Sequence, residues 1–87
     1  MAVIKKKAHP KFFEAVASGR KKFDFRVADF PIKEGDVLIL QEWDPETKRF
    51  TGRSVIKNVG YLVKFDLNSF GQKELIEKNG FYVIQFE

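Results

Sequence analysis

The alternation of charged and aromatic side chains in residues 20–27 constrains the fold more than any other feature of the sequence. In a strand, side chains two residues apart share a face and lie about 6.6–6.8 Å from each other. One face would hold Phe23, Phe25 and Val27, and the other would hold Lys22, Asp24 and Arg26. The aromatic face needs a core, whereas the charged face has no packing reason to place two cations around one carboxylate. We therefore expect this strand to form the floor of a binding site.

The segments around this strand carry further helix and strand signals. A first strand is expected over residues 2–8, and His9-Pro10 then opens a helix because proline suits the first helical position. Gly19 is suited to end that helix in the left-handed conformation. Further strands are expected over residues 37–43, 50–65 and 81–86. A tight turn is expected over residues 44–48 and a short helical turn within residues 66–79.

The resulting order, β-α-β-β-β-β, predicts an α+β fold in a single domain covering residues 1–87. A chain of this length is too small for two packed sheets. We expect a small curled sheet or barrel of five to six strands, with one N-terminal helix and a short second helical turn. Gly52 and Gly60 are candidates for bulges or bends that let such a sheet curl.

Composition excludes several classes of protein. The chain has no cysteine, so disulfide frameworks and thiolate metal sites are excluded. No apolar segment approaches the ~20 residues of a membrane span, and residues 1–7 lack the apolar core of a signal peptide. One histidine and scattered acids give no metal-ligand spacing, and no phosphate loop or dinucleotide fingerprint is present. We expect a cytoplasmic protein without metal, cofactor or membrane partner, as a monomer or weak dimer.

Positive charge is concentrated near the N-terminus. Residues 1–26 carry eight Lys or Arg against two acids, a net charge of +6, and residues 27–87 carry eight against ten, a net charge of −2. A basic end on a near-neutral body favours an anionic partner such as RNA or a nucleotide. The alternative is that this charge only keeps the protein soluble, and that the lysines of residues 5–7 only protect a strand edge.

Five motifs carry a resemblance to a known family. The helix end and the basic stretch of residues 17–26 resemble the Gly-x-Lys-x-x-(Glu/Asp/Thr)-x-Arg motif of the ASCH (activating-signal-cointegrator homology) family. Residues 35–38 are similar to that family's Gly-Asp strand entry, and residues 81–84 to its closing strand. Residues 42–44 and 50–53 resemble a small uncharacterised bacterial and phage subfamily.

The resemblance implies a PUA-like β-barrel and a function in binding RNA or modified nucleosides. One branch that resembles this motif hydrolyses acylated cytidines with a lysine, a threonine and a glutamate. Lys21 matches the lysine, and the threonine position holds Asp24. No glutamate of this chain matches the third residue.

The candidate ligand-binding residues are Lys21, Lys22, Asp24, Arg26, Glu42, Trp43 and Arg53. The planar guanidinium of Arg26 suits a phosphate or a base edge, and the indole of Trp43 suits a stacked base. Each assignment has a structural alternative: Asp24 forms a surface ion pair with Arg26 or Lys22, Trp43 packs in the core or rim, and Arg53 caps a hairpin. His9 is either a helix cap or a functional group that titrates near neutral pH.

Two functional hypotheses follow, together with a third in which the aromatic surface binds another protein. The first is an RNA- or nucleotide-binding module that uses a basic cleft between the first helix and the barrel. The second is a small hydrolase acting on RNA or an acylated nucleoside. Its catalytic residues would be Lys21 and Asp24, with Glu42 as the alternative proton-transfer partner of Lys21.

Overall fold

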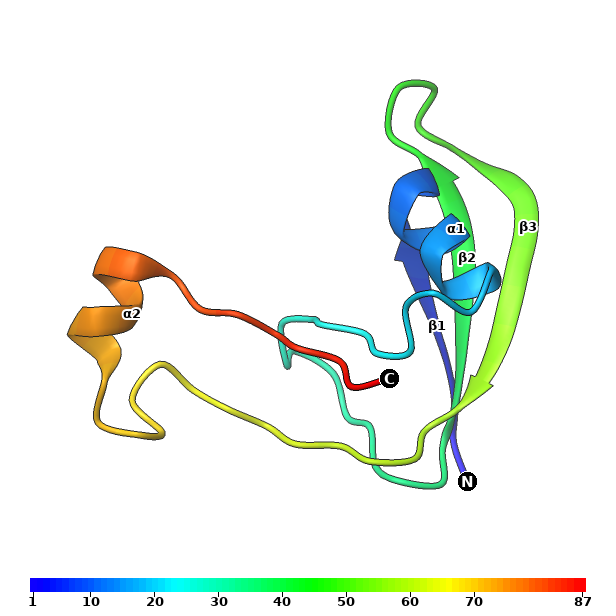
Figure 1. Ribbon diagram of the computed structural model, residues 1–87. Coiled ribbons are helices and arrows are strands. Elements are labelled where there is room, and N and C mark those ends of the chain that lie inside the picture. Colours follow the sequence, from blue (N-terminus) through cyan, green and yellow to red (C-terminus); the bar gives the residue numbers. More distant parts are fainter.

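The computed structural model describes residues 1–87 and contains one three-stranded sheet with a helix packed on it (Figure 1). The strands are β1 (Val3–Ala8), β2 (Val37–Asp44) and β3 (Arg49–Asn58), in the order β1-β2-β3. β1 and β2 run parallel, and the chain between them passes through helix α1 (Pro10–Ala17). Parallel neighbours need such a crossover, because a tight turn can join only antiparallel strands.

Helix α1 supplies two of the five residues of a small core. Phe13 and Val16 from α1 pack with Leu38 and Leu40 of β2 and with Ala8 of β1. Phe13 is only 1% exposed, and burying a phenylalanine side chain contributes about 1.5–3 kcal/mol. The predicted helix is confirmed, with proline as its first residue and Gly19 just beyond its end at a φ of +84°.

β2 and β3 form an antiparallel hairpin over the predicted turn, which is also confirmed. The register between them shifts between Gln41 and Trp43, so that Gln41 lies opposite Ser54 and Trp43 opposite Phe50. Gly52 lies inside this irregularity with a φ of +94°, a conformation that other residues rarely adopt. The bulge expected at this glycine is therefore confirmed.

The predicted PUA-like barrel of five to six strands is wrong. The sheet is open and has three strands, and residues 20–27 and 81–86 lie outside any strand. The strand expected over residues 50–65 ends at Asn58. An alternating pattern favours extended backbone, but it does not supply a neighbouring strand. Residues 20–27 are held by contacts of individual side chains where a strand ladder was expected.

After β3 the chain leaves the sheet. Figure 1 shows residues 60–87 running away from the sheet to helix α2 (Lys73–Asn79) and then returning toward residues 20–27. α2 ends at Gly80, whose φ is +73°, and confirms the expected helical turn. Neither helix is long and apolar enough to cross a membrane.

Candidate functional site

A hollow of about 460 Å³ lies between α1, the end of β1 and residues 21–26. Its charged lining comes from Lys7, Lys21, Asp24 and Arg26, and its aromatic lining from Phe12, Phe23 and Phe25. Core residues form its base, because Ala8, Val16 and Leu40 also line it. The hollow thus brings together three of the predicted site residues, Lys21, Asp24 and Arg26.

Two lysines of the hollow lie over aromatic rings. The Nζ atom of Lys21 is 5.1 Å from the ring centroid of Phe12 and 5.0 Å from that of Phe23. The Nζ atom of Lys7 is 4.4 Å from the ring centroid of Trp43. Neither ammonium group forms an ion pair with a carboxylate. The rings position both cations by cation–π attraction and leave their charge available to an anion.

Arg26 and Asp24 form the ion pair that the sequence left as an alternative. Arg26 Nε pairs with the Asp24 carboxylate, and Arg26 NH2 donates a hydrogen bond of 2.7 Å to the carbonyl oxygen of Lys7. The guanidinium therefore fastens residues 24–26 to the end of β1. Because Arg26 keeps further N–H donors and lines the hollow, it supplies positive charge there as well as support.

Lys22 and Trp43 do not line the hollow. The side chain of Lys22 is exposed, and its backbone N–H donates to the side chain of Gln85. Trp43 is half-buried, and its ring stacks on His9 with centroids 5.9 Å apart and planes at 29°. Since His9 itself lines the hollow, Trp43 borders the site through this partner.

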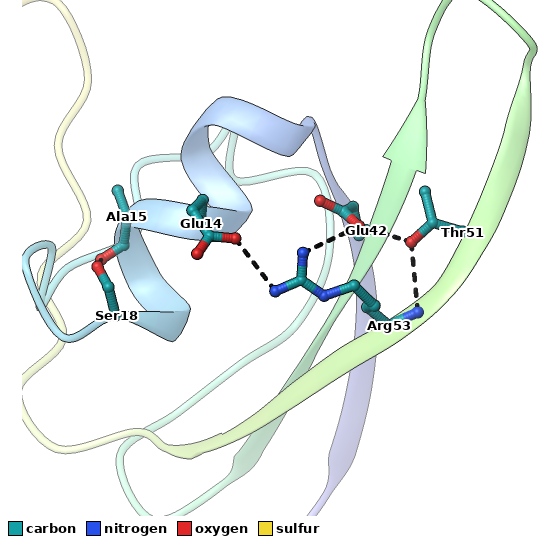
Figure 2. A network of polar contacts seen from close by, with 6 residues as sticks. All are labelled: Glu14, Ala15, Ser18, Glu42, Thr51 and Arg53. Carbon is teal, nitrogen blue, oxygen red and sulfur yellow. Dashed lines mark hydrogen bonds and ion pairs between the residues drawn. The ribbon is translucent and has the colours of Figure 1, made fainter.

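Glu42 and Arg53 belong to a different cluster, which Figure 2 shows between α1 and the β2–β3 hairpin. The Arg53 guanidinium lies 4.9 Å from the ring centroid of the buried Phe13. The Thr51 hydroxyl donates a hydrogen bond of 2.6 Å to the Glu42 carboxylate. Arg53 lies 3.7 Å from the same carboxylate and 3.1 Å from that of Glu14. The bulge in β3 turns both side chains toward Glu42, so this network joins the hairpin to α1 and stays away from the hollow.

Lys7, Phe12 and Val83 line the hollow but are absent from the residues predicted for the site. Lys7 had a signal in the sequence, because it lies at the carboxyl end of a strand that precedes a helix. The sequence alone favours protection of a strand edge as its role. The pairing of β1 with β2, which places Lys7 at the hollow, joins segments far apart in the sequence and has no local signal. Val83 comes from a distant segment, and no pattern in the sequence connects it to the first helix.

Asp36 is the one titratable group whose pKa departs clearly from its ordinary value. Backbone N–H groups of Ala2 and Lys33 each donate a hydrogen bond of 2.9 Å to its carboxylate. These bonds, followed by the positive charges of Lys33 and the N-terminus, lower the pKa of Asp36 below its ordinary value of 3.8. Asp36 lies away from the hollow and fastens the start of β1 to the turn before β2.

The structure contains no group of three or more histidine, aspartate or glutamate side chains placed to hold a metal ion.

Residues 4–81 match the model of a family described as "Domain of unknown function (DUF3850)". The chain belongs to this family. The match includes Lys7, Lys21, Asp24 and Arg26, so the charged lining of the hollow lies within the DUF3850 domain.

One relative of this DUF3850 chain is the "Uncharacterized 12.9 kDa protein in GpA 3'region" of Escherichia phage P2. The two are 45% identical over 49 residues, which is 56% of this chain and 43% of the phage protein. The chain therefore covers less than half the length of this relative.

Proposed function

We propose that the protein binds RNA or a nucleotide in the hollow between α1, the end of β1 and residues 21–26. The observation that carries the proposal is the convergence of three cations, Lys7, Lys21 and Arg26, on one hollow that holds a single carboxylate. Phosphate groups are the anions that such a cluster attracts most strongly in a nucleic acid.

The aromatic lining supports a nucleotide over a simple inorganic anion. Phe12, Phe23 and Phe25 surround the cations, and the His9–Trp43 stack borders them. Bases stack on aromatic side chains without regard to sequence, with about 1–3 kcal/mol per base. A site with cations for the phosphate and rings for the base fits a single-stranded or unpaired nucleotide, whose base is free to stack. The resemblance of residues 17–26 to the ASCH motif points to the same class of ligand.

The neighbouring pair Lys21 and Lys22 allows a matched test. Both side chains carry the same charge, but only Lys21 lines the hollow. Lys21→Gln is expected to weaken binding of a fluorescent single-stranded RNA by about tenfold or more, since a hydrogen bond to a charged group contributes about 1.5–3 kcal/mol. It should also reduce the slope of log K against log salt by about 0.7, the value for one lost phosphate contact on a single strand.

Lys22→Gln is the control, because it changes the net charge equally outside the hollow. Fluorescence anisotropy over a salt series measures both effects. Equal weakening by the two substitutions would mean that RNA responds only to overall charge, and it would refute a site in the hollow. No binding of RNA or mononucleotide by the wild-type protein would refute the proposed function itself.

A second candidate is a hydrolase acting on RNA or an acylated nucleoside. It is supported by Lys21 and Asp24, which line the same hollow and carry the two proton-transfer groups that such chemistry requires. Incubation of the wild-type protein and Lys21→Ala with acylated nucleosides tests it directly. Product release at the same background rate in both would exclude Lys21 as a catalytic residue.

A further inference from the structure

The last part of the chain presents an apolar face that nothing covers. In residues 81–86 the side chains of Tyr82, Ile84 and Phe86 are 73–92% exposed, whereas the alternate Phe81 and Val83 are 56% and 46% exposed. Phe81 packs on Phe25 with ring centroids 5.4 Å apart, and Val83 lines the hollow. Exposure thus alternates with the period of a strand, with one side turned to the protein and the other bare.

The backbone of residues 81–86 is also without partners. None of its N–H or C=O groups takes part in a backbone hydrogen bond with another segment. The hydrogen bonds that join this stretch to the body come from the Gln85 side chain, which accepts from the Lys22 N–H and donates a hydrogen bond of 3.1 Å to the carbonyl oxygen of Arg20. An extended segment with apolar side chains and unpaired backbone N–H and C=O groups is suited to add to the edge of a sheet.

The sheet offers a matching edge. β1 has β2 on one side and no strand on the other, and it is six residues long, the same length as residues 81–86. In this structure the single polar contact on the free side comes from Arg26 at the Lys7 carbonyl. An open edge of this kind pairs readily with another extended chain.

The charges around the two segments are complementary. β1 carries Lys5, Lys6 and Lys7 and no acid, within a segment of net charge +6. Residues 66–87 carry four acids against two lysines, a net charge of −2. Residues 81–86 themselves carry no charge, and the acid nearest to them in sequence is Glu87. In the protein's own fold Val83 lines the hollow beside the end of β1, but no backbone hydrogen bond joins residues 81–86 to β1. The edge of β1 therefore stays open to this segment of a second copy.

We propose that residues 81–86 of one copy add as a strand to the free edge of β1 in a second copy, and that the second copy does the same in return. Such a reciprocal exchange is closed and two-fold symmetric, so it ends at a dimer. Residues 60–80 provide the reach, because they extend away from the sheet before the chain turns back (Figure 1). The exchange covers the apolar face of Tyr82, Ile84 and Phe86 in both copies.

Disulfide trapping tests the exchange without background, because the chain has no cysteine. Lys5→Cys is combined with either Val83→Cys or Ile84→Cys, since consecutive strand residues point to opposite faces and one of the two lies on the side of Lys5. When the singly substituted proteins are mixed and oxidised, we expect a disulfide-linked dimer with twice the 10.1 kDa mass of the chain. A double variant that closes into a disulfide-bonded monomer would show that the arm folds onto its own sheet and would overturn the proposal.

Solution mass provides the second test. Light scattering over a concentration series is expected to show the wild-type protein moving from monomer to dimer. Ile84→Asp should weaken the dimer by about tenfold or more, since it places a charge in a buried apolar contact. Val27→Asp is the matched control, because Val27 is exposed to a similar extent, 78% against 73%, outside the arm. A wild-type protein that stays monomeric throughout, or equal effects of the two substitutions, would reject the exchange.

Discussion

The contact between Thr51 and Glu42 gives the sharpest prediction for stability. Glu42 is 6% exposed, and its carboxylate accepts a hydrogen bond of 2.6 Å from the Thr51 hydroxyl. Its other polar partner, Arg53, lies 3.7 Å away, beyond hydrogen-bonding distance. Thr51→Val removes the hydroxyl and keeps the shape of the side chain, so it leaves a nearly buried carboxylate without its short donor.

The magnitude follows from the charge on the acceptor. A hydrogen bond to a charged group contributes about 1.5–3 kcal/mol, and we take the lower end because Arg53 still lies near the carboxylate. For a domain of this size, a loss of about 1.5 kcal/mol lowers the melting temperature by about 6–12 °C. Thermal unfolding followed by circular dichroism measures the shift.

Thr47→Val is the matched control, because Thr47 lies in the turn before β3 and its hydroxyl makes no hydrogen bond within the protein. This substitution is expected to change the melting temperature by less than about 2 °C. If Thr51→Val and Thr47→Val give the same melting temperature, the hydroxyl of Thr51 does not stabilise Glu42 and the reasoning is refuted.

Three further outcomes are expected. Phe13→Ala should lower the free energy of unfolding in urea by about 3–5 kcal/mol or abolish folding, and Phe12→Ala should cost much less because Phe12 is half exposed. Gly19→Ala should lower the free energy of unfolding by about 1–2 kcal/mol, because an added Cβ has open space there but the φ is positive. Gly60→Ala should lower it less, because Gly60 has the same open space and no positive φ. Because the pKa of Asp36 is lowered in the native state, its stabilising contribution is present above its ordinary pKa of 3.8 and is lost as the pH falls through the native value. Acid unfolding of Asp36→Asn should therefore lack that part of the pH dependence and begin from a lower stability at neutral pH; identical acid-unfolding curves would contradict it.

The elements with local signals could be predicted from the sequence. Pro10 and Gly19 mark the two ends of α1, and the tight turn before Arg49 sets the β2–β3 hairpin. These signals act through φ angles and missing N–H groups within a few residues. The barrel failed because its closure depended on residues 20–27 and 81–86 finding neighbouring strands. Their alternating side chains favour an extended backbone, but they do not determine which strand edge that backbone pairs with.

The candidate site could be predicted in part for the same reason. Lys21, Asp24 and Arg26 come together because they are close in sequence, but Lys22 lies outside, since the backbone there is extended without the regular faces of a paired strand. Lys7 reaches the hollow through the parallel pairing of β1 with β2, which is not visible locally. Glu42 is separated from the hollow because the bulge opposite it directs Thr51 and Arg53 to its carboxylate.

The base and the wall of the hollow are stabilised in different ways, and this bears on how a ligand would act. The base consists of core residues such as Leu40, whose removal would cost several kcal/mol. The wall, residues 21–26, is held by the Arg26 contacts to Asp24 and Lys7 and by the Gln85 side chain. An exposed ion pair such as Arg26–Asp24 contributes only about 0–1 kcal/mol, and a neutral hydrogen bond such as that of the Gln85 side chain contributes about 0.5–1.5 kcal/mol. An anion bound between Lys7, at the end of β1, and Lys21, in the wall, would connect the wall to the sheet directly. Ligand binding would then stabilise residues 20–27, which have no strand pairing to hold them.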